Sequence, residues 1–429
     1  MASRTKLIAN GELRGKVRVP PSKSYTHRAA IMASLSPGES RVLSPLISRD
    51  TIATFQACRA MGATLTESNG SLTIAGTEPR AADDVVNVEN SGTTLRFMTS
   101  VFALPERGCT ILTGDDSVRR RPMGGLLEAL KGLGARAQSA QGNGCAPVIV
   151  GEGGIEGGSA EIRGDVSSQF VSSILISAPL ARRDVTLRVV DAVSRPYIDA
   201  TLKLSELHGI SVERDGYSSF HVGGGQTYRG CDFPVPGDFS SASFIMAAAA
   251  LVGGEVELTG LSTSFPQGDS EIVNLLERLG VEVSRRPDST IIRSDGGSLN
   301  GGAFDLSDTP DLLPVMGTLA LKCDRPLEIS GVAHARFKET DRISVTAEEL
   351  SKIGAEVHER SDGITIARPS KLTPAVLDAH GDHRMFMAFS LASLLLPDGL
   401  PVVGVESLDV SYPSFFNDMQ RLGASVARA

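Results

Sequence analysis

Six times along the chain, a stretch with helical hydrophobic spacing ends at a glycine, and an alternating strand pattern follows. The glycines recur at intervals of roughly 70 residues, at Gly62, Gly134, Gly209, Gly280, Gly354 and Gly423. Glycine adopts the left-handed conformation that ends a helix without a steric penalty. The repeat therefore predicts six copies of one mixed α/β unit, with a helix covering a sheet face.

Two copies show the pattern of the unit clearly. Residues 272–279 carry apolar side chains at helical spacing, and Val281 and Val283 then alternate with polar residues. A turn and a return strand follow. The next copy repeats this arrangement, with Asp362-Gly363 as the predicted hairpin turn.

The sixth copy is incomplete, because only six residues follow its glycine. The segment 6–19 at the N-terminus has strand-like patterns and is expected to supply the missing strands. Prolines at 20–21 and at 234–236 mark two crossovers. We therefore expect an inserted three-unit domain at 20–236, and a second three-unit domain formed by 1–19 and 237–429.

Charge and cysteine usage exclude several classes of protein. The formal net charge of −8 disfavours a broad nucleic-acid-binding face. The five cysteines are scattered without a CxxC pair, which disfavours a zinc site or a disulfide framework. The longest apolar run, 244–253, is about half of the ~20 residues that span a bilayer. We expect a cytoplasmic protein with no nucleic-acid or membrane partner.

The sequence PPSKSYTHRAA (20–30) predicts a helix N-terminus that binds phosphate. Two prolines stop the preceding strand, and Ser22 or Ser24 is expected to cap the helix. Lys23 and Arg28 then add positive charge beside free backbone N–H groups. An ordinary capped surface helix is the competing interpretation.

Three more helix starts in this half carry polar or basic groups. Gly92, in ENSGTTLRF, predicts a turn that a ligand can approach closely. Three arginines precede Pro122, and we expect Arg121 to lie nearest the following helix and to bind an anion. Hydroxyl and amide groups also precede two apolar helices, where they either cap the helix or read a polyol or carboxylate: Ser167, Ser168, Gln169 and Ser194.

The C-terminal half contributes acids and bases in three motifs. Asp311 follows a proline at a helix start, where a buried carboxylate can act as a base. The triplet Asp382-His383-Arg384 leads directly into an apolar helix. A third motif alternates charge and is equally typical of a solvated helix start: Lys338, Glu339, Asp341 and Arg342.

Other catalytic motifs are absent from the sequence. There is no GxSxG elbow, no GxxxxGK[ST] phosphate loop and no glycine-rich dinucleotide motif between a strand and a helix. Nearly every repeat instead begins a helix with Ser, Lys or Arg. If those N-termini face one cleft, positive potential is focused there, and the site suits anionic substrates.

Seven motifs, in order and spacing, resemble the 5-enolpyruvylshikimate-3-phosphate synthase family over nearly the whole chain: SKSYTHR, NSGTTLR, RRRPMGGL, DVSSQF, VPGDFSSASF, KETDR and GDHRM. The resemblance implies an α/β fold of two similar domains, each of three βαβαββ units (an inside-out α/β barrel), joined by two hinge strands. It implies transfer of the enolpyruvyl group of phosphoenolpyruvate to the 5-hydroxyl of shikimate 3-phosphate, with release of phosphate, in aromatic amino acid biosynthesis. A monomer without metal or cofactor is expected.

The resemblance also implies residue roles. Shikimate 3-phosphate would be bound by Lys23, Ser24, Arg28, Ser167, Ser168, Gln169, Ser194, Asp311 and Lys338. Phosphoenolpyruvate would be bound by Lys23, Gly92, Arg121, Gln169, Arg342 and Arg384. Asp311 is the candidate base, and either Glu339 or Lys23 is the candidate acid. Two positions depart from the family pattern: His334 stands where Asn is common, and no Lys lies near Val410.

Two alternatives belong to other activities. The related transferase that acts on UDP-N-acetylglucosamine typically has a reactive Cys before the Arg-Pro, where this chain has Asp116 in DDSVRRRP. A non-catalytic anion-binding protein is disfavoured by the joint presence of Lys23, Asp311 and Glu339.

Overall fold

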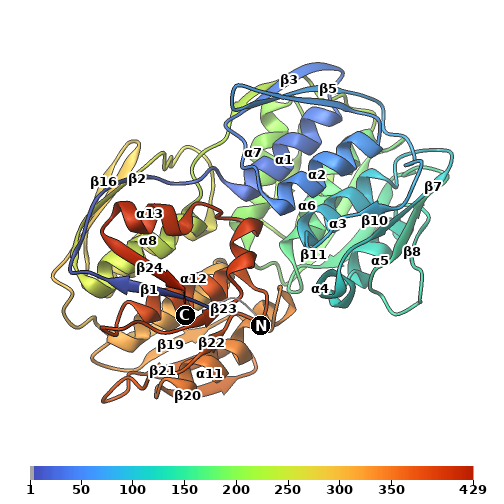
Figure 1. The fold of residues 1–429 in the computed structure, drawn as a ribbon. Helices are drawn as coiled ribbons and strands as arrows, with labels where there is room; N and C mark the ends of the chain where they lie inside the picture. Colours follow the sequence, from blue (N-terminus) through green and yellow to red (C-terminus); the bar gives the residue numbers. More distant parts are fainter. Residues whose placement is uncertain (1–3, 429) are drawn as a thin grey trace. The chain divides into compact units, whose positions relative to one another are not determined.

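The computed structural model describes residues 4–428, which form two compact α/β units. Unit 1 comprises Met1–Pro20 and Pro236–Ala429, and unit 2 comprises Pro21–Val235. Each unit contains three four-stranded sheets (Figure 1). In every sheet one pair of strands at an edge is parallel, and the other two neighbouring pairs are antiparallel. The predicted α/β class and six-fold repeat are confirmed.

Unit 2 has the sheet orders β14-β3-β5-β4, β6-β7-β9-β8 and β10-β11-β13-β12. Its strands are β3 (Gly38–Leu43), β4 (Thr64–Ser68), β5 (Ser71–Gly76), β6 (Val86–Asn87), β7 (Cys109–Thr113), β8 (Ala137–Ser139), β9 (Val148–Gly151), β10 (Gly158–Arg163), β11 (Val185–Val190), β12 (Glu213–Asp215), β13 (Ser219–Val222) and β14 (Asp232–Pro234). Its helices are α1 (Lys23–Ser34), α2 (Arg49–Ala60), α3 (Gly92–Val101), α4 (Asp116–Arg120), α5 (Gly124–Gly132), α6 (Ser168–Ser177), the 3-10 turn η1 (Ala178–Leu180) and α7 (Arg195–Leu207).

Unit 1 has the sheet orders β16-β17-β15-β2, β18-β19-β21-β20 and β22-β23-β1-β24. Its strands are β1 (Arg4–Ala9), β2 (Leu13–Arg18), β15 (Gly254–Thr259), β16 (Glu282–Arg286), β17 (Ser289–Ser294), β18 (Gly302–Asp305), β19 (Leu327–Ser330), β20 (Glu356–Arg360), β21 (Gly363–Ala367), β22 (Leu377–Asp378), β23 (Val402–Val403) and β24 (Ala424–Arg428). Its helices are α8 (Phe239–Val252), α9 (Ile272–Arg278), α10 (Leu313–Leu319), α11 (Arg342–Lys352), α12 (His383–Ser393) and α13 (Phe415–Arg421). Its 3-10 turns are η2 (Gly268–Glu271), η3 (Pro310–Leu312), η4 (Ala320–Lys322), η5 (Ala333–Phe337) and η6 (Val405–Val410).

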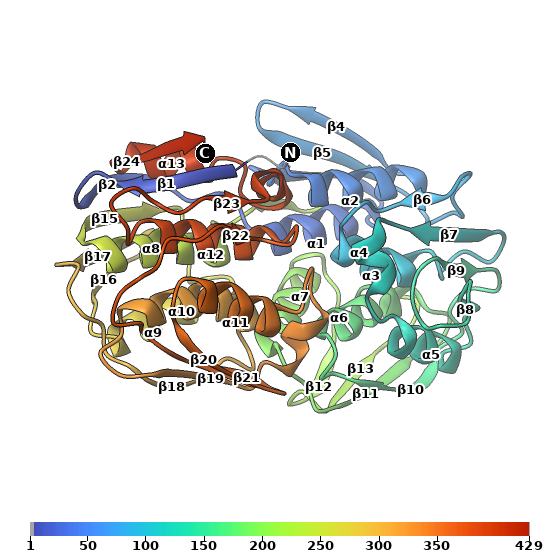
Figure 2. The same ribbon diagram turned by 60° about the horizontal axis from the view of Figure 1, so that its bottom comes forward.

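Apolar helices run through the interior of each unit, with the sheets outside them (Figure 2). In unit 1, α8 packs against α10 and α12, and all its residues except Val252 are buried. In unit 2, α6 packs between α3 and α7. These helices carry apolar side chains on every face because a sheet or another helix surrounds them on every side. Within residues 4–428, no helix is long and apolar enough to cross a membrane.

The six repeat glycines all have positive φ, between 78° at Gly209 and 113° at Gly62, as a helix-ending glycine requires. One predicted hairpin turn is wrong in register. Arg360 pairs with Gly363, so the turn residues are Ser361 and Asp362, and Gly363 belongs to β21. Glycine is needed there for space, because a Cβ would lie 2.1 Å from the Ile329 carbonyl oxygen.

The N-terminal segment does supply strands to unit 1. β1 pairs antiparallel with β23 and with β24, which completes the sixth sheet. β2 pairs parallel with β15 and completes the fourth sheet. Leu7 and Leu13 anchor these strands, since both side chains are almost fully buried.

Candidate functional site

Arg342, the first residue of α11, lies at the centre of a buried charge cluster in unit 1. Its side chain is 1% exposed. Each guanidinium nitrogen donates to a different carboxylate at 2.7 Å: Nε to Asp382, Nη1 to Asp311 and Nη2 to Glu339. Burial alone would lower the pKa of Arg342, but the three negative charges outweigh burial and raise it. Arg342 is therefore permanently charged and fixes the three carboxylates.

Asp311 makes ion pairs with three basic side chains. Besides the bond from Arg342, its carboxylate lies 3.0 Å from Arg384 Nη2 and 3.5 Å from Lys338 Nζ. Burial would raise the pKa of Asp311, but the charges of Arg384, Lys338 and Arg342 hold it well below its usual value. Asp311 is ionised here, and it is a poor proton acceptor while all three cations remain beside it.

Asp382, to which the sequence assigned no role, accepts hydrogen bonds from both Arg342 and Arg384. It is the N-cap of α12, and its Oδ1 accepts a hydrogen bond from the backbone N–H of Arg384 at 2.8 Å. Its two oxygens also accept from Arg342. The sequence marked Asp382-His383-Arg384 as unusual, but a capping carboxylate that holds an arginine 40 residues away leaves no local pattern.

The structure thus brings five predicted residues of unit 1 into one cluster: Asp311, Lys338, Glu339, Arg342 and Arg384. It also shows that Arg342 is not a solvated helix-start residue, the competing interpretation of KETDR. The two positions that depart from the family pattern, His334 and Val410, are both buried.

In unit 2 the starts of α3 and α6 are tied together by polar side chains. Arg96 Nη1 donates to Gln169 Oε1 at 2.8 Å and to Ser167 Oγ at 3.4 Å. Gln169 Nε2 donates in turn to Thr93 Oγ1 at 2.9 Å. Ser167 is the N-cap of α6 and accepts from the Gln169 N–H, which is one of the two roles that the sequence left open for it. The N-termini of α3 and α6 therefore lie beside the Gln169 amide and the Arg96 guanidinium.

Arg121 lies against Gly92 at the start of α3. A Cβ at Gly92 would come within 2.4 Å of Arg121 Nη1. Arg121 is buried, and its Nη2 donates to Ser117 Oγ at 3.2 Å. One expectation is corrected: Arg119 and Arg120 end the short helix α4, where the dipole is negative, and do not start α5.

Lys23 in the first turn of α1 and Arg28 in the second lie in different environments. Lys23 Nζ makes an ion pair with Asp50 at 3.0 Å. Arg28 is buried and donates from Nε to Thr201 Oγ1 at 2.8 Å and from Nη2 to the Tyr197 carbonyl at 3.0 Å. Burial lowers the pKa of Arg28 to about 10. Arg28 therefore also holds α1 against α7.

Two serines at helix starts behave differently from a simple cap. Ser22 is the N-cap residue of α1, but its side chain makes no capping hydrogen bond, so the predicted cap is wrong. Ser194, the N-cap of α7, has φ 51° and is likewise without a side-chain cap bond. A non-glycine residue in this left-handed region is strained, and such strain is concentrated at ligand sites. Ser24 and Ser168 lie in the first turns of α1 and α6.

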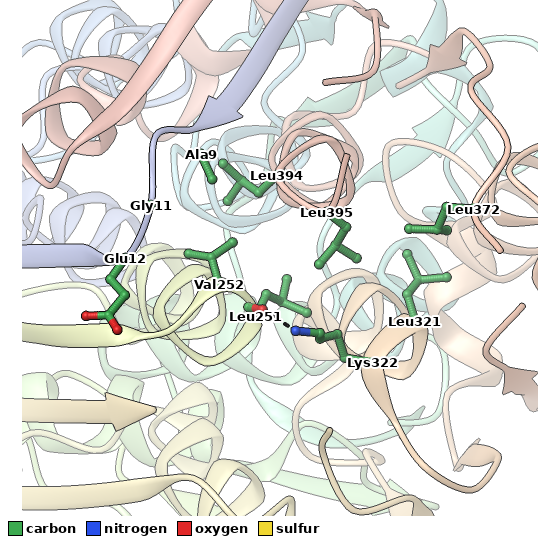
Figure 3. A pocket seen from close by; sticks show the side chains of 10 residues that line it. All are labelled: Ala9, Gly11, Glu12, Leu251, Val252, Leu321, Lys322, Leu372, Leu394 and Leu395. Carbon is green, nitrogen blue, oxygen red and sulfur yellow. Dashed lines mark hydrogen bonds between the residues drawn. The ribbon is translucent and has the colours of Figure 1, made fainter. Parts of the chain in front are cut away.

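A cavity of about 480 Å³ lies elsewhere in unit 1 (Figure 3). It is lined by residues that include Leu251, Leu321 and Leu394, and by none of the predicted site residues. The ammonium group of Lys322 at its wall donates to the Leu251 carbonyl at 3.0 Å and to the Gly296 carbonyl. Glu12 also lines the cavity, so its wall combines apolar side chains with an acid and a base.

Comparison with known proteins shows the family of the chain. The family model described as EPSP synthase (3-phosphoshikimate 1-carboxyvinyltransferase) matches residues 8–419. A 3-phosphoshikimate 1-carboxyvinyltransferase of Methanothermobacter thermautotrophicus is 45% identical over 417 residues, which cover 96% of this chain and 97% of the relative. Its counterpart in Methanocella arvoryzae is 42% identical over 422 residues, 98% and 99% of the two chains.

Solved structures give the same result. The EPSP synthase of Acinetobacter baumannii superposes with a TM-score of 0.83 at 26% identity, with both chains covered completely. Matches of this length exclude a shared domain on an unrelated protein. The chain belongs to the EPSP synthase (3-phosphoshikimate 1-carboxyvinyltransferase) family.

Proposed function

We propose that this chain transfers the enolpyruvyl group of phosphoenolpyruvate to the 5-hydroxyl of shikimate 3-phosphate through the residues of the two clusters described above. The observation that carries the assignment of roles is the Asp311 carboxylate, which three cations hold in a buried site. The reaction needs a base for the hydroxyl, an acid for the methylene carbon, and cations for the phosphate and carboxylate.

Arg342 and Arg384 are proposed to bind phosphoenolpyruvate. Arginine presents forked donors that match a carboxylate or a phosphate. Both arginines also contact Asp311, so an anion bound to them competes with Asp311 for their charge. As that charge is shared, the pKa of Asp311 rises toward its usual value. Binding of one substrate thereby makes Asp311 a better base for the hydroxyl of the other.

Residues of unit 2 are proposed to complete the binding of both substrates. Gly92 and Arg121 contribute to phosphoenolpyruvate binding, and Lys23 and Gln169 contribute to both substrates. Asp311 and Lys338 are assigned to the hydroxyl groups of shikimate 3-phosphate. The rest of this substrate is assigned to serines at helix starts and to one arginine: Ser24, Arg28, Ser167, Ser168 and Ser194. The support for these roles is that their helices begin with backbone N–H groups beside basic side chains.

The proton donor to the methylene carbon is assigned to Glu339 or Lys23. Glu339 is fixed by Arg342 at 2.7 Å and its side chain is 13% exposed. Lys23 is held by Asp50, and its side chain is 14% exposed. Both groups combine partial access with a fixed geometry, which a general acid requires.

The enzyme is proposed to work as a cytoplasmic monomer. All five cysteines are free thiols, as expected in a reducing compartment. Among residues 4–428, the large apolar side chains that remain exposed are scattered along the sequence, from Ile47 to Val376.

Phosphate release with either acceptor tests the proposed substrate. With phosphoenolpyruvate and shikimate 3-phosphate, the purified protein is expected to release phosphate in proportion to enzyme concentration. With phosphoenolpyruvate and UDP-N-acetylglucosamine, release is expected to stay at the background rate. The opposite preference would overturn the substrate assignment, and no release with either acceptor would overturn the activity.

Gly92→Ala tests the role of Arg121. The added methyl group would displace the Arg121 guanidinium, and a charge-assisted hydrogen bond contributes about 1.5–3 kcal/mol, so KM for phosphoenolpyruvate is expected to rise roughly tenfold or more. Gly124→Ala is the matched control, since its Cβ would meet nothing closer than 3.9 Å. Equal KM values for both variants and the wild type would remove Arg121 from the phosphoenolpyruvate site.

A further inference from the structure

Asp269 is a buried acid of unit 1 to which the roles above assign nothing. It lies in η2 and is 1% exposed. Its Oδ2 accepts a hydrogen bond from the hydroxyl group of Ser240, in the first turn of α8. Its Oδ1 is buried and has no hydrogen-bond partner among residues 4–428. A carboxylate left in this state is costly, whereas a neutral carboxyl group is much less so.

The backbone around Asp269 is fixed against the start of α8. The Gln267 side chain accepts from the Phe239 N–H at 3.1 Å and donates to the Gly237 carbonyl at 2.8 Å. Asp238 caps the same helix through the Ser241 N–H at 2.9 Å. These bonds hold the segment before Asp269 beside the start of α8.

Helix α8, whose Ser240 holds Asp269, packs against η2, η3 and α12, so charged groups on three other elements act on this carboxyl group. Burial raises its pKa most, the negative charge of Asp311 in η3 raises it further, and Arg384 in α12 lowers it. Asp238 at the start of α8 adds a smaller upward effect, and the Ser240 hydrogen bond a downward one. The result is a pKa of about 6.

The charge balance of the cluster depends on this one proton. Asp311, Glu339 and Asp382 are balanced by Lys338, Arg342 and Arg384, and an ionised Asp269 adds a negative charge to that of Asp238. An anionic ligand at Arg384 then adds negative charge to a site where carboxylates already outnumber cations. Neutral Asp269 reduces that excess.

We propose that Asp269 is a positioning residue that acts through Arg384: it takes up a proton from solvent when an anion binds against Arg384, and in its neutral form it strengthens that anion site. The inference rests on the proposed binding of phosphoenolpyruvate by Arg384. It assigns to Asp269 no contact with the substrate. Its effect is on how strongly the arginine attracts the anion at a given pH.

Asp269→Asn separates this role from a structural one. The amide has the shape of the acid and is always neutral, so kcat/KM for phosphoenolpyruvate is expected to match the wild type below about pH 5 and to exceed it roughly tenfold above about pH 7. The ionisation of phosphoenolpyruvate itself is the same for both proteins and cancels in the ratio. Asp418→Asn, which changes a buried aspartate of unit 1 bonded to Ser414, is the control and is expected to leave the profile unchanged.

Ser240→Ala provides a second test that keeps Asp269. Loss of the hydroxyl removes a hydrogen bond that favours the carboxylate, so the pH at which kcat/KM falls is expected to move upward. This variant decides the matter if Asp269→Asn does not fold.

The outcomes separate a failure of the proposed function from a failure of the role proposed for Asp269. If the wild-type protein releases no phosphate from phosphoenolpyruvate and shikimate 3-phosphate, the proposed function fails. If it is active but the ratio of the Asn variant to the wild type is constant across pH, Asp269 has only a structural role and the inference is overturned. An unshifted profile for Ser240→Ala overturns it as well.

Discussion

Arg342→Met is expected to lower the free energy of unfolding by about 3–5 kcal/mol and to abolish phosphate release. The substitution leaves Asp311, Glu339 and Asp382 without the guanidinium that each of them contacts at 2.7 Å. Removing one partner of a buried ion pair costs far more than the pair contributes, because the other charges stay desolvated. Urea unfolding followed by circular dichroism measures the change.

The same reasoning predicts how the loss depends on pH. The folded-state pKa of Asp311 is lowered, so its stabilising contribution is present above its unfolded pKa of about 3.9 and is lost as pH falls toward the lower folded value. The difference between wild type and Arg342→Met is therefore expected to shrink below about pH 4.

Arg293→Met is the matched control for this substitution. Arg293 also bridges two carboxylates, Glu255 at 2.8 Å and Glu282 at 2.9 Å, but its side chain is 37% exposed. Water screens such a pair, and its loss is expected to cost less than about 1 kcal/mol. Equal destabilisation by the two variants would show that burial of the cluster contributes nothing to stability.

Asp311→Asn is expected to lower kcat by about 10²–10⁴-fold while the protein stays folded. The amide cannot accept the hydroxyl proton. It also no longer competes for Arg342 and Arg384, so KM for phosphoenolpyruvate is expected to fall or stay the same. Steady-state kinetics with each substrate varied in turn measures both parameters.

Asp288→Asn is the control for the loss of one carboxylate in the same unit. Asp288 is exposed in the turn between β16 and β17, and its replacement is expected to leave kcat within about twofold of the wild type. A kcat for Asp311→Asn that is also close to the wild type would exclude Asp311 as the base. A rise in KM without a fall in kcat would make it a binding residue only.

The fold was predictable because its repeat is local. A helical stripe, a glycine and a strand pattern follow one another within about 20 residues, and all six glycines adopt the expected positive φ. The register of a turn was less predictable. Asp362-Gly363 has a turn-like composition, yet Gly363 is a strand residue because the Ile329 carbonyl leaves no room for a side chain.

The identity of the charged residues was predictable, but their mutual arrangement was not. The sequence marked Asp311, Arg342 and Arg384 separately, since each lies at a helix start. Arg342 holds two carboxylates from residues 31 and 40 positions away. This contact depends on how the helices of unit 1 pack, and no local pattern records it. Asp269 was missed for the same reason, because QGDS reads as an ordinary loop.

The pairing of β1 with β24 also sets an order of events during synthesis. All three sheets of unit 2 use strands between residues 38 and 234, so they have every partner when little more than half the chain has emerged from the ribosome. β1 precedes every strand of unit 2 in the chain, but its neighbours β23 and β24 follow them all. β1 must therefore remain unpaired while the intervening strands are synthesised, exposed to chaperones and to other nascent chains, and its sheet can close only once β23 and β24 have emerged.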